Sequence, residues 1–119
     1  MTPEEYIMQV KDIDLRIRSL EGELHDVEAE NDTEYAEELR ASIKSDIEKF
    51  KQLKLRIREE IQQLKDNKLS ALLIEYYIRG RSWEQVAFVL DCKSVKNVRE
   101  GLRKKALEAF RDKYPQYFS

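Results

Sequence analysis

The sequence contains few of the residues that most enzymes and metalloproteins use for their functional sites. Its 119 residues include one cysteine, one histidine, two prolines and three glycines. Cys92 has no second cysteine to pair with and lies far along the chain from His25. We therefore expect neither a disulfide within the chain nor a metal site. There is also no glycine-rich phosphate loop and no nucleophile–base set, so we expect no catalytic residue, no enzymatic activity and no cofactor.

Long apolar runs are missing as well. A membrane-spanning helix needs roughly 18–20 consecutive apolar residues, and the sequence has no such stretch. The first residues are acidic and polar, unlike the basic start of a signal peptide. We therefore expect a cytoplasmic protein without a membrane partner.

Charge and helix-forming residues are abundant instead. Charged residues make up 39% of the chain and apolar residues 41%. This composition is typical of long amphipathic helices, so the predicted fold class is all-α. Residues 1–65 carry 17 acidic and 11 basic side chains, a net charge of −6, whereas residues 66–119 carry 7 and 11, a net charge of +4. The asymmetry indicates an anion-binding region in the second half.

The chain opens with a complete helix-start signal. Thr2 can cap a helix, Pro3 suits its first position, and Glu5 completes a capping box. Apolar residues then recur at alternating spacings of four and three, which is a heptad pattern. They are Tyr6, Val10, Ile13, Ile17, Leu20, Leu24 and Val27. The pattern predicts a first amphipathic helix.

A second amphipathic helix follows a short connection. Asn31, Asp32 and Thr33 are its candidate caps. Its apolar residues also recur mostly at spacings of three and four, and they are Tyr35, Leu39, Ile43, Ile47, Phe50, Leu53, Ile57, Ile61 and Leu64. Two helices joined so closely must fold back on each other, so residues 1–66 are predicted to form an antiparallel coiled-coil hairpin.

The apolar stripes are broad for a lone hairpin. We therefore expect the hairpin to be an oligomerisation arm, with two copies forming a four-helix bundle in a homodimer. The residues expected to form this oligomerisation surface are Val10, Ile13, Ile17, Leu20, Leu24, Ile43, Phe50 and Ile57. The alternative is that the hairpin packs only on itself and on its own C-terminal domain.

Residues 67–119 predict a second, tri-helical domain. A short apolar helix over 69–78 ends before Gly80, which can adopt the left-handed conformation that follows many helices. Ser82 and Gln85 form another capping box and open a second helix. Nothing between the hairpin and this domain forbids a continuous helix.

The last predicted helix is basic. Asp91, Cys92 and Lys93 turn the chain, and Ser94 caps a helix that runs to about Tyr114. The inward face of this helix is predicted to be Val95, Val98, Leu102, Ala106, Ala109 and Phe110. This order of elements is typical of a helix-turn-helix domain: a short helix, a capped second helix, a tight turn and a capped basic helix.

These residues resemble region four of bacterial sigma factors. The first matching stretch, from Tyr76 to Leu90, reads Tyr-Tyr-x-x-Gly-x-Ser-x-Glu-x-Val-Ala-x-x-Leu. The second begins at Ser94 with Ser-x-Lys-x-Val-Arg and continues at Lys105 with Lys-Ala-Leu. With its acidic arm and small size, the whole chain resembles phage and prophage late-gene transcription regulators of the ArpU and RinA type. The resemblance implies promoter recognition and contact with RNA polymerase.

Two features depart from the sigma pattern. The turn from Asp91 to Ser94 is one residue longer than in the primary sigma factors. Gly101 lies inside the presumed recognition helix, where a glycine costs about 1 kcal/mol relative to alanine.

DNA binding is expected chiefly from the helix that follows Ser94. From Lys93 to Lys105 the sequence has six basic residues and one acidic residue, a local charge of +5. Early positions of a recognition helix reach base edges, and the residues expected there with the Ser94 cap are Lys96, Asn97, Arg99 and Glu100. The residues expected to hold phosphates are Arg103, Lys104, Lys93, Arg79 and Arg81. The alternative is a basic face that is only solvated.

The remaining aromatic residues have simpler interpretations. Trp83, Tyr76 and Tyr77 are expected to pack in or beside the core. The tail at 114–118 is aromatic, and it either folds back over the core or contacts a partner, which would be a second protomer or polymerase.

The sequence therefore supports two functions from different classes. The leading hypothesis is a sequence-specific DNA-binding transcription regulator that is encoded by a phage or prophage and acts on double-stranded DNA. The alternative is a DNA-packaging protein of the small-terminase kind or another structural DNA-binding oligomer. A third interpretation, a coiled-coil protein that binds only other proteins, leaves the charge asymmetry unexplained.

Overall fold

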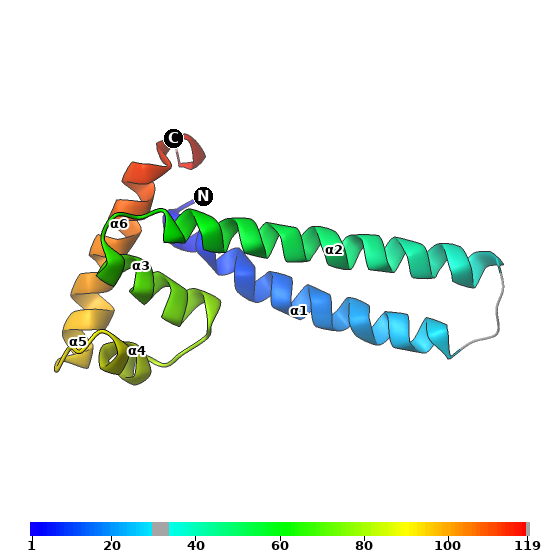
Figure 1. The fold of residues 1–119 in the computed structure, drawn as a ribbon, viewed down its shortest axis with the longest axis horizontal. Helices are drawn as coiled ribbons and strands as arrows, with labels where there is room; N and C mark the ends of the chain where they lie inside the picture. Colours follow the sequence, from blue (N-terminus) through cyan, green and yellow to red (C-terminus); the bar gives the residue numbers. More distant parts are fainter. Residues whose placement is uncertain (30–33, 119) are drawn as a thin grey trace. The chain divides into compact units, whose positions relative to one another are not determined.

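A computed structural model describes residues 1–29 and 34–118, and it shows an all-α protein (Figure 1). The predicted fold class is thereby confirmed. The candidate caps Asn31, Asp32 and Thr33 lie outside the described residues. Within the described part of the chain, no helix combines the length and the hydrophobicity that crossing a membrane requires.

The chain divides into two compact units. Unit 1 combines Met1–Val10 with Ile57–Ser119, and unit 2 consists of Lys11–Arg56. The boundary expected from the sequence was a single one, after residue 66. The structure instead groups both open ends of the hairpin with the C-terminal helices, so the two longest helices each pass through both units.

Unit 2 is the main part of the hairpin. Helices α1 (Pro3–Glu28) and α2 (Glu34–Gln62) run antiparallel in it, as Figure 1 shows. The residues that are buried in unit 2 are Ile13, Ile17, Val27, Ala36, Ile43 and Ile47. The ammonium group of Lys54 lies 2.8 Å from a carboxylate oxygen of Asp14 and joins the two arms by an ion pair. The heptad seam predicted from the sequence is thus the surface along which one chain packs on itself.

This packing changes the expectation for the oligomerisation surface. Five of the eight residues expected to meet a second copy are buried within the single chain, namely Val10, Ile13, Ile17, Ile43 and Ile57. Leu20, Leu24 and Phe50 remain half-exposed. The hairpin covers more of its own stripes than the width of the pattern indicated, because two antiparallel seams interdigitate. Any partner must therefore be met by the half-exposed residues and their surroundings.

The first turn of α1 is capped as the sequence predicted. The hydroxyl of Thr2 accepts a hydrogen bond of 3.1 Å from the backbone N–H of Glu5, and the Glu5 carboxylate accepts one of 3.1 Å from the N–H of Thr2. The hydrogen bond that the Glu5 carboxylate accepts from the backbone N–H of Thr2 lowers the pKa of Glu5, and the Thr2 side chain adds to this effect. Two backbone N–H groups at the helix start are therefore satisfied by local side chains.

The hairpin does not continue into the next helix. Helix α2 ends at Gln62, and α3 (Asn67–Leu73) begins after the N-cap residue Asp66. The Asp66 side chain accepts hydrogen bonds of 2.9 and 3.1 Å from the backbone N–H groups of Lys68 and Leu69. Ser70 then donates a hydrogen bond of 3.0 Å to the carbonyl of Ile61, which fixes α3 against the end of α2.

The rest of unit 1 is built from short helical segments. A π-helical turn, η1 (Ile74–Ile78), extends α3, and α4 (Trp83–Val89) follows. The last long helix consists of α5 (Val95–Asn97), the π-helical turn η2 (Val98–Leu102) and α6 (Arg103–Lys113), and the 3₁₀ turn η3 (Pro115–Tyr117) comes after it. The fully buried side chains of unit 1 include Ile7, Ile61, Leu72, Leu73, Val86, Val98 and Phe110. One core therefore holds the start of α1, the end of α2 and the helix-turn-helix together.

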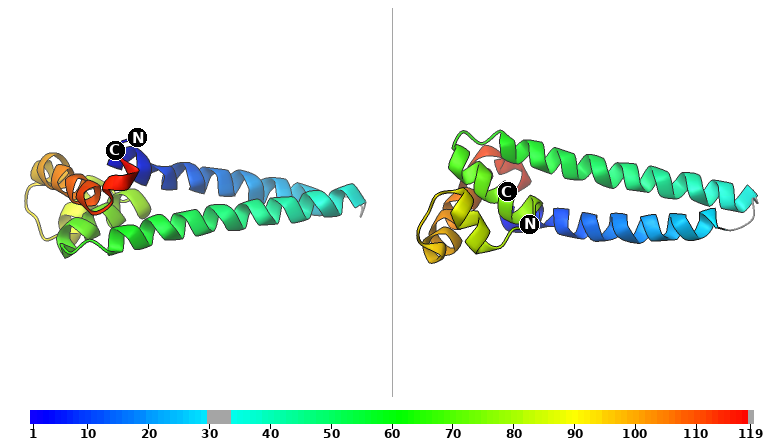
Figure 2. Two further views of the ribbon diagram at one scale, coloured as in Figure 1. Left: turned by 90° about the horizontal axis from the view of Figure 1, so that it is seen from above. Right: turned by 60° about the horizontal axis from the view of Figure 1, so that its bottom comes forward.

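The aromatic tail folds back over this core. Tyr117 stacks on Tyr6 with 5.1 Å between ring centroids, and Phe118 meets the same ring edge-on at 5.9 Å. The buried carboxylate of Glu60 accepts hydrogen bonds of 2.5 Å from the hydroxyls of Tyr6 and Tyr117. Figure 2 shows the two ends of the chain close together in both views. Of the two alternatives for the tail, the structure shows packing on the chain's own core.

Candidate nucleic-acid interface

The two turns of the helix-turn-helix have the local chemistry that the sequence predicted. Gly80 has a φ of 69°, which is the left-handed conformation expected after a helix end. Ser82 caps α4, since its hydroxyl accepts a hydrogen bond of 3.2 Å from the N–H of Gln85. The side-chain oxygen of Gln85 accepts a hydrogen bond of 2.9 Å from the N–H of Ser82, which completes the capping box.

The second turn contains an unusual backbone conformation. Asp91 has a φ of 54°, a left-handed value that is uncommon outside glycine and that aspartate tolerates better than most residues. The backbone N–H of Cys92 donates a hydrogen bond of 2.9 Å to the carbonyl of Ala87. Ser94 then caps the next helix, accepting a hydrogen bond of 3.2 Å from the N–H of Asn97. The turn therefore ends α4 and starts the candidate recognition helix within a few residues.

The candidate recognition helix has the expected extent but not a uniform geometry. The N–H of Arg103 bonds the carbonyl of Val98, five residues earlier, so the helix widens into a π turn at η2. Gly101 lies in this turn and is exposed. A π turn accommodates one extra residue per turn, so the side chains after it are rotated relative to a regular α-helix. The sequence-based assignment of faces therefore applies best to the residues before the turn.

The residues expected to read bases lie on the exposed side of α5 and of the first residues of η2. Val98 is fully buried and anchors the helix in the core of unit 1. Lys96, Asn97, Arg99 and Glu100 are exposed, and the Ser94 cap is half-buried. The guanidinium of Arg99 lies 3.8 Å from the carboxylate of Glu100, an exposed pair that water and salt weaken. This group of exposed side chains is accessible to a ligand.

Arg103 is held inside unit 1. Its guanidinium donates a hydrogen bond of 2.7 Å to the Glu4 carboxylate and another of 3.0 Å to the carbonyl of Arg99. The hydroxyl of Tyr77 donates a hydrogen bond of 2.5 Å to the same Glu4 oxygen. Burial and the neighbouring carboxylate of Glu4 together raise the pKa of Tyr77. Arg103, which is expected to hold phosphate, therefore also ties the basic helix to the start of α1.

Arg79 and Arg81 also have a partner within the chain. Arg79 lies 2.9 Å and Arg81 3.9 Å from the carboxylate oxygens of Glu75. Both arginine side chains remain about half-exposed, at 51% and 42%. The remaining residues expected to hold phosphate, Lys93 and Lys104, are exposed. The residues expected to hold phosphate are thus split between exposed cations and cations that are paired within the chain.

The structure adds two residues that the sequence analysis missed. Glu4 lies 99 residues from Arg103, and no local pattern connects them. Phe88 projects from α4 with 87% of its surface exposed, and it lines a cavity of about 400 Å³ together with Val89, Arg79 and Arg81. Its exposure could have been inferred from helical periodicity, because Val86 and Ala87 occupy the inward face of the same short helix.

Packing interpretations of the other aromatic residues are supported. Trp83 stacks on Tyr76 with ring centroids 3.8 Å apart, and Tyr76 meets Tyr77 edge-on at 4.9 Å. Among the residues that the structure describes, no group of three or more His, Cys, Asp or Glu side chains is placed to hold a metal ion.

Comparisons with models of known protein families, with curated proteins and with solved structures gave no match to this chain.

Proposed function

We propose that this protein is a sequence-specific DNA-binding regulator of transcription, and that the helix starting at Val95 enters the major groove. The observation that carries the proposal is the exposed set of side chains that projects from a helix capped by Ser94 and anchored by buried Val98. This set consists of Lys96, Asn97, Arg99 and Glu100. Arginine pairs with guanine, asparagine with adenine and glutamate with cytosine, so these side chains suit base recognition. The charge of +5 between Lys93 and Lys105 attracts the DNA backbone.

Exposure and ion pairing favour some of the basic residues over others for positioning the DNA. Lys93 and Lys104 are exposed cations beside the helix start and are the better candidates for phosphate contacts. Arg103 supports the interface from within unit 1 through Glu4 and Tyr77. Arg79 and Arg81 would have to share their charge between a phosphate and Glu75.

Further parts of the proposal rest on the sequence resemblance and on the hairpin. The resemblance to sigma region four and to phage regulators favours a phage or prophage origin and RNA polymerase as a second partner. The apolar residues that the hairpin leaves half-exposed favour a homodimer. A symmetric dimer would read an inverted repeat, whereas a sigma-like module would read a single asymmetric site.

The test is selection of bound duplexes from a random DNA pool by the purified full chain. We expect a defined motif, and we expect it to blur for the triple variant Lys96→Ala, Asn97→Ala and Arg99→Ala. The double variant Lys44→Ala and Lys51→Ala is the matched control, because it removes the same number of positive charges from exposed positions on α2. Binding without any motif, weakened by salt alike in all three proteins, would contradict base recognition and would favour DNA packaging.

A further inference from the structure

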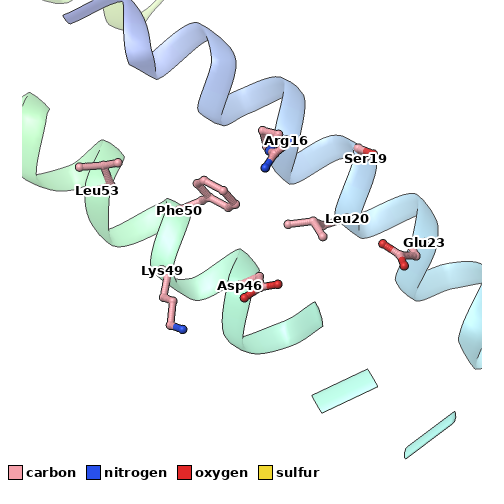
Figure 3. Close-up of a pocket in the computed structure, with 8 residues that line it drawn as sticks. All are labelled: Arg16, Ser19, Leu20, Glu23, Asp46, Lys49, Phe50 and Leu53. Atoms are coloured by element: carbon pink, nitrogen blue, oxygen red, sulfur yellow. The ribbon is translucent and has the colours of Figure 1, made fainter. Parts of the chain in front are cut away.

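The two arms of unit 2 leave a groove open between them. It has a volume of about 630 Å³ and is lined by Arg16, Ser19, Leu20 and Glu23 of α1 and by Asp46, Lys49, Phe50 and Leu53 of α2. Figure 3 shows the side chains of Leu20 and Phe50 pointing toward each other across the gap. Both are seam residues, yet both are only half-buried. The seam that is closed at Ile13, Ile17, Ile43 and Ile47 is therefore incomplete at this level of the hairpin.

The charges that line the groove differ between its two ends. Because the arms are antiparallel, Arg16 lies at the same end as Leu53, and Glu23 lies at the same end as Asp46 (Figure 3). The guanidinium of Arg16 lies 5.8 Å from the ring centroid of Phe50, which supports this register. One end of the groove thus presents the Arg16 guanidinium and the other end the carboxylates of Glu23 and Asp46, with apolar side chains and Ser19 between them. Lys49 also lines the groove on α2, and Figure 3 shows its side chain directed away from α1.

We infer that a second copy of this chain docks in this groove with its hairpin antiparallel to the first. A two-fold axis near Ser19 and Leu20 brings Arg16 of each copy to the Glu23 and Asp46 end of the other. Each contact then occurs twice, as an isologous interface requires. Leu20, Phe50 and Leu53 of both copies fill the space between the charged ends, so the two open seams close each other.

A parallel pairing would juxtapose like charges at both ends and is therefore disfavoured. The antiparallel pairing also fixes the topology of the dimer. Residues 11 and 56 lie at the same end of each hairpin, so the two copies leave the four-helix bundle at opposite ends. A two-fold axis between residues 19 and 20 brings residue 11 of one copy level with residue 28 of the other. At a rise of 1.5 Å per residue, the two ends at which the chains leave the bundle are therefore about 26 Å apart along its axis.

The inference deepens the homodimer part of the proposed function, and its readout is independent of DNA. The test is the mass of the full chain by sedimentation equilibrium at micromolar concentration. We expect twice the mass of the 14.2 kDa chain. Two variant proteins are made, one with Arg16→Glu and the other with both Glu23→Lys and Asp46→Lys. In a homodimer of either variant like charges face each other, so each variant by itself is expected to sediment as a monomer. An equimolar mixture of the two proteins restores both attractive contacts and is expected to sediment as a dimer.

Two controls carry the same charge changes at exposed positions outside the groove. Arg18→Glu and the pair Glu21→Lys with Glu38→Lys are expected to leave the dimer intact. A wild-type chain that sediments as a monomer overturns the inference. Groove variants that remain dimers, or a mixture that stays monomeric, overturn it as well.

A second experiment avoids any change of charge in the groove. In a Cys92→Ser background, Ser19→Cys lies next to the proposed two-fold axis and is expected to form a disulfide with its counterpart in the second copy under mild oxidation. Ala41→Cys, exposed on α2 and absent from the groove lining, is the matched control and is expected to remain uncrosslinked. Equal crosslinking at both positions would overturn the antiparallel arrangement.

Discussion

Units 1 and 2 are both helical, but different interactions hold them together. In unit 2 a repeating aliphatic seam joins two helices, and the pattern is visible in the sequence at every turn. In unit 1, aromatic rings and buried hydrogen bonds join residues that are far apart along the chain, such as Tyr6 with Glu60 and Tyr77 with Glu4. The seam of unit 2 leaves a groove between its two helices, whereas a satisfied polar network such as that of unit 1 specifies one arrangement of its partners.

This difference bears on function. A recognition helix must be held within a fraction of an ångström to read bases, so a rigid, specific core beneath it is useful. In the dimer that we propose, the hairpin needs only a complementary surface for a second chain. The following substitutions test this contrast, from the largest expected effect to the smallest.

Phe110→Ala should destabilise the protein most. Phe110 is fully buried and contacts the rings of Tyr6, Tyr114 and Phe118, so truncation leaves a cavity that several aromatic residues line. We expect a loss of about 3–5 kcal/mol in the free energy of unfolding, measured by urea denaturation. Phe50→Ala, at a half-exposed position in unit 2, should cost clearly less at a concentration where the chain is monomeric. Equal losses would remove the contrast between the units.

Arg103→Ala should separate an anchoring arginine from the exposed ones. Removing Arg103 leaves Glu4 and Tyr77 without their cation, and we expect a loss of about 1–3 kcal/mol in the free energy of unfolding. Arg99→Ala and Lys96→Ala remove exposed side chains and should change it by less than about 0.5 kcal/mol. Thermal melts of the three variants decide the matter, and a larger loss for Arg99→Ala would contradict the structural assignment.

Alkaline pH should weaken unit 1 through Tyr77. Its pKa is raised in the folded protein by burial and by Glu4, so folding favours the neutral phenol. The stabilisation is therefore complete below the pKa of the unfolded state, about 10, and is lost as the pH rises above that value. Tyr77→Phe should show a shallower loss of stability between neutral and strongly alkaline pH than the wild type. Parallel stability curves would show that Tyr77 makes no such contribution.

Gly101→Ala should have the smallest effect, and it should be a gain. A Cβ atom at this position meets no other atom within 4 Å, and Gly101 lies in a helical turn. We expect an increase of about 0.5–1 kcal/mol in the free energy of unfolding, measured by denaturant titration. If the DNA backbone passes close to this exposed turn, the same variant should bind DNA less tightly despite its higher stability. A destabilised variant would mean that the π turn itself depends on glycine.

The parts of the fold that were predictable are those that local chemistry determines. The caps at Thr2, Ser82 and Ser94 involve a partner three residues away, so the sequence shows both members of each pair. The helix-turn-helix order and the left-handed Gly80 follow from the same local rules. The heptad spacing predicted the two long helices, because their seam repeats.

The parts that were not predictable depend on tertiary contacts. Glu4 and Arg103 are each ordinary charged residues in sequence, and only the folded core brings them together. The π turn at η2 begins at the fully buried Val98, and no local sequence pattern indicated it. The depth of the hairpin seam was underestimated for a related reason, since periodicity shows which residues share a face but not how fully two faces cover each other.

The most direct test of the central claim is the affinity of the full chain for its selected DNA site, compared with a scrambled duplex at the same salt concentration. We expect the selected site to bind at least about 100-fold more tightly, and we expect Lys96→Ala with Arg99→Ala to remove most of this preference, since a good bidentate base contact contributes about 1–3 kcal/mol. The control variant Lys44→Ala with Lys51→Ala should keep the preference. Equal affinity for the two duplexes, or a preference unchanged by the loss of Lys96 and Arg99, would contradict recognition through the helix that begins at Val95.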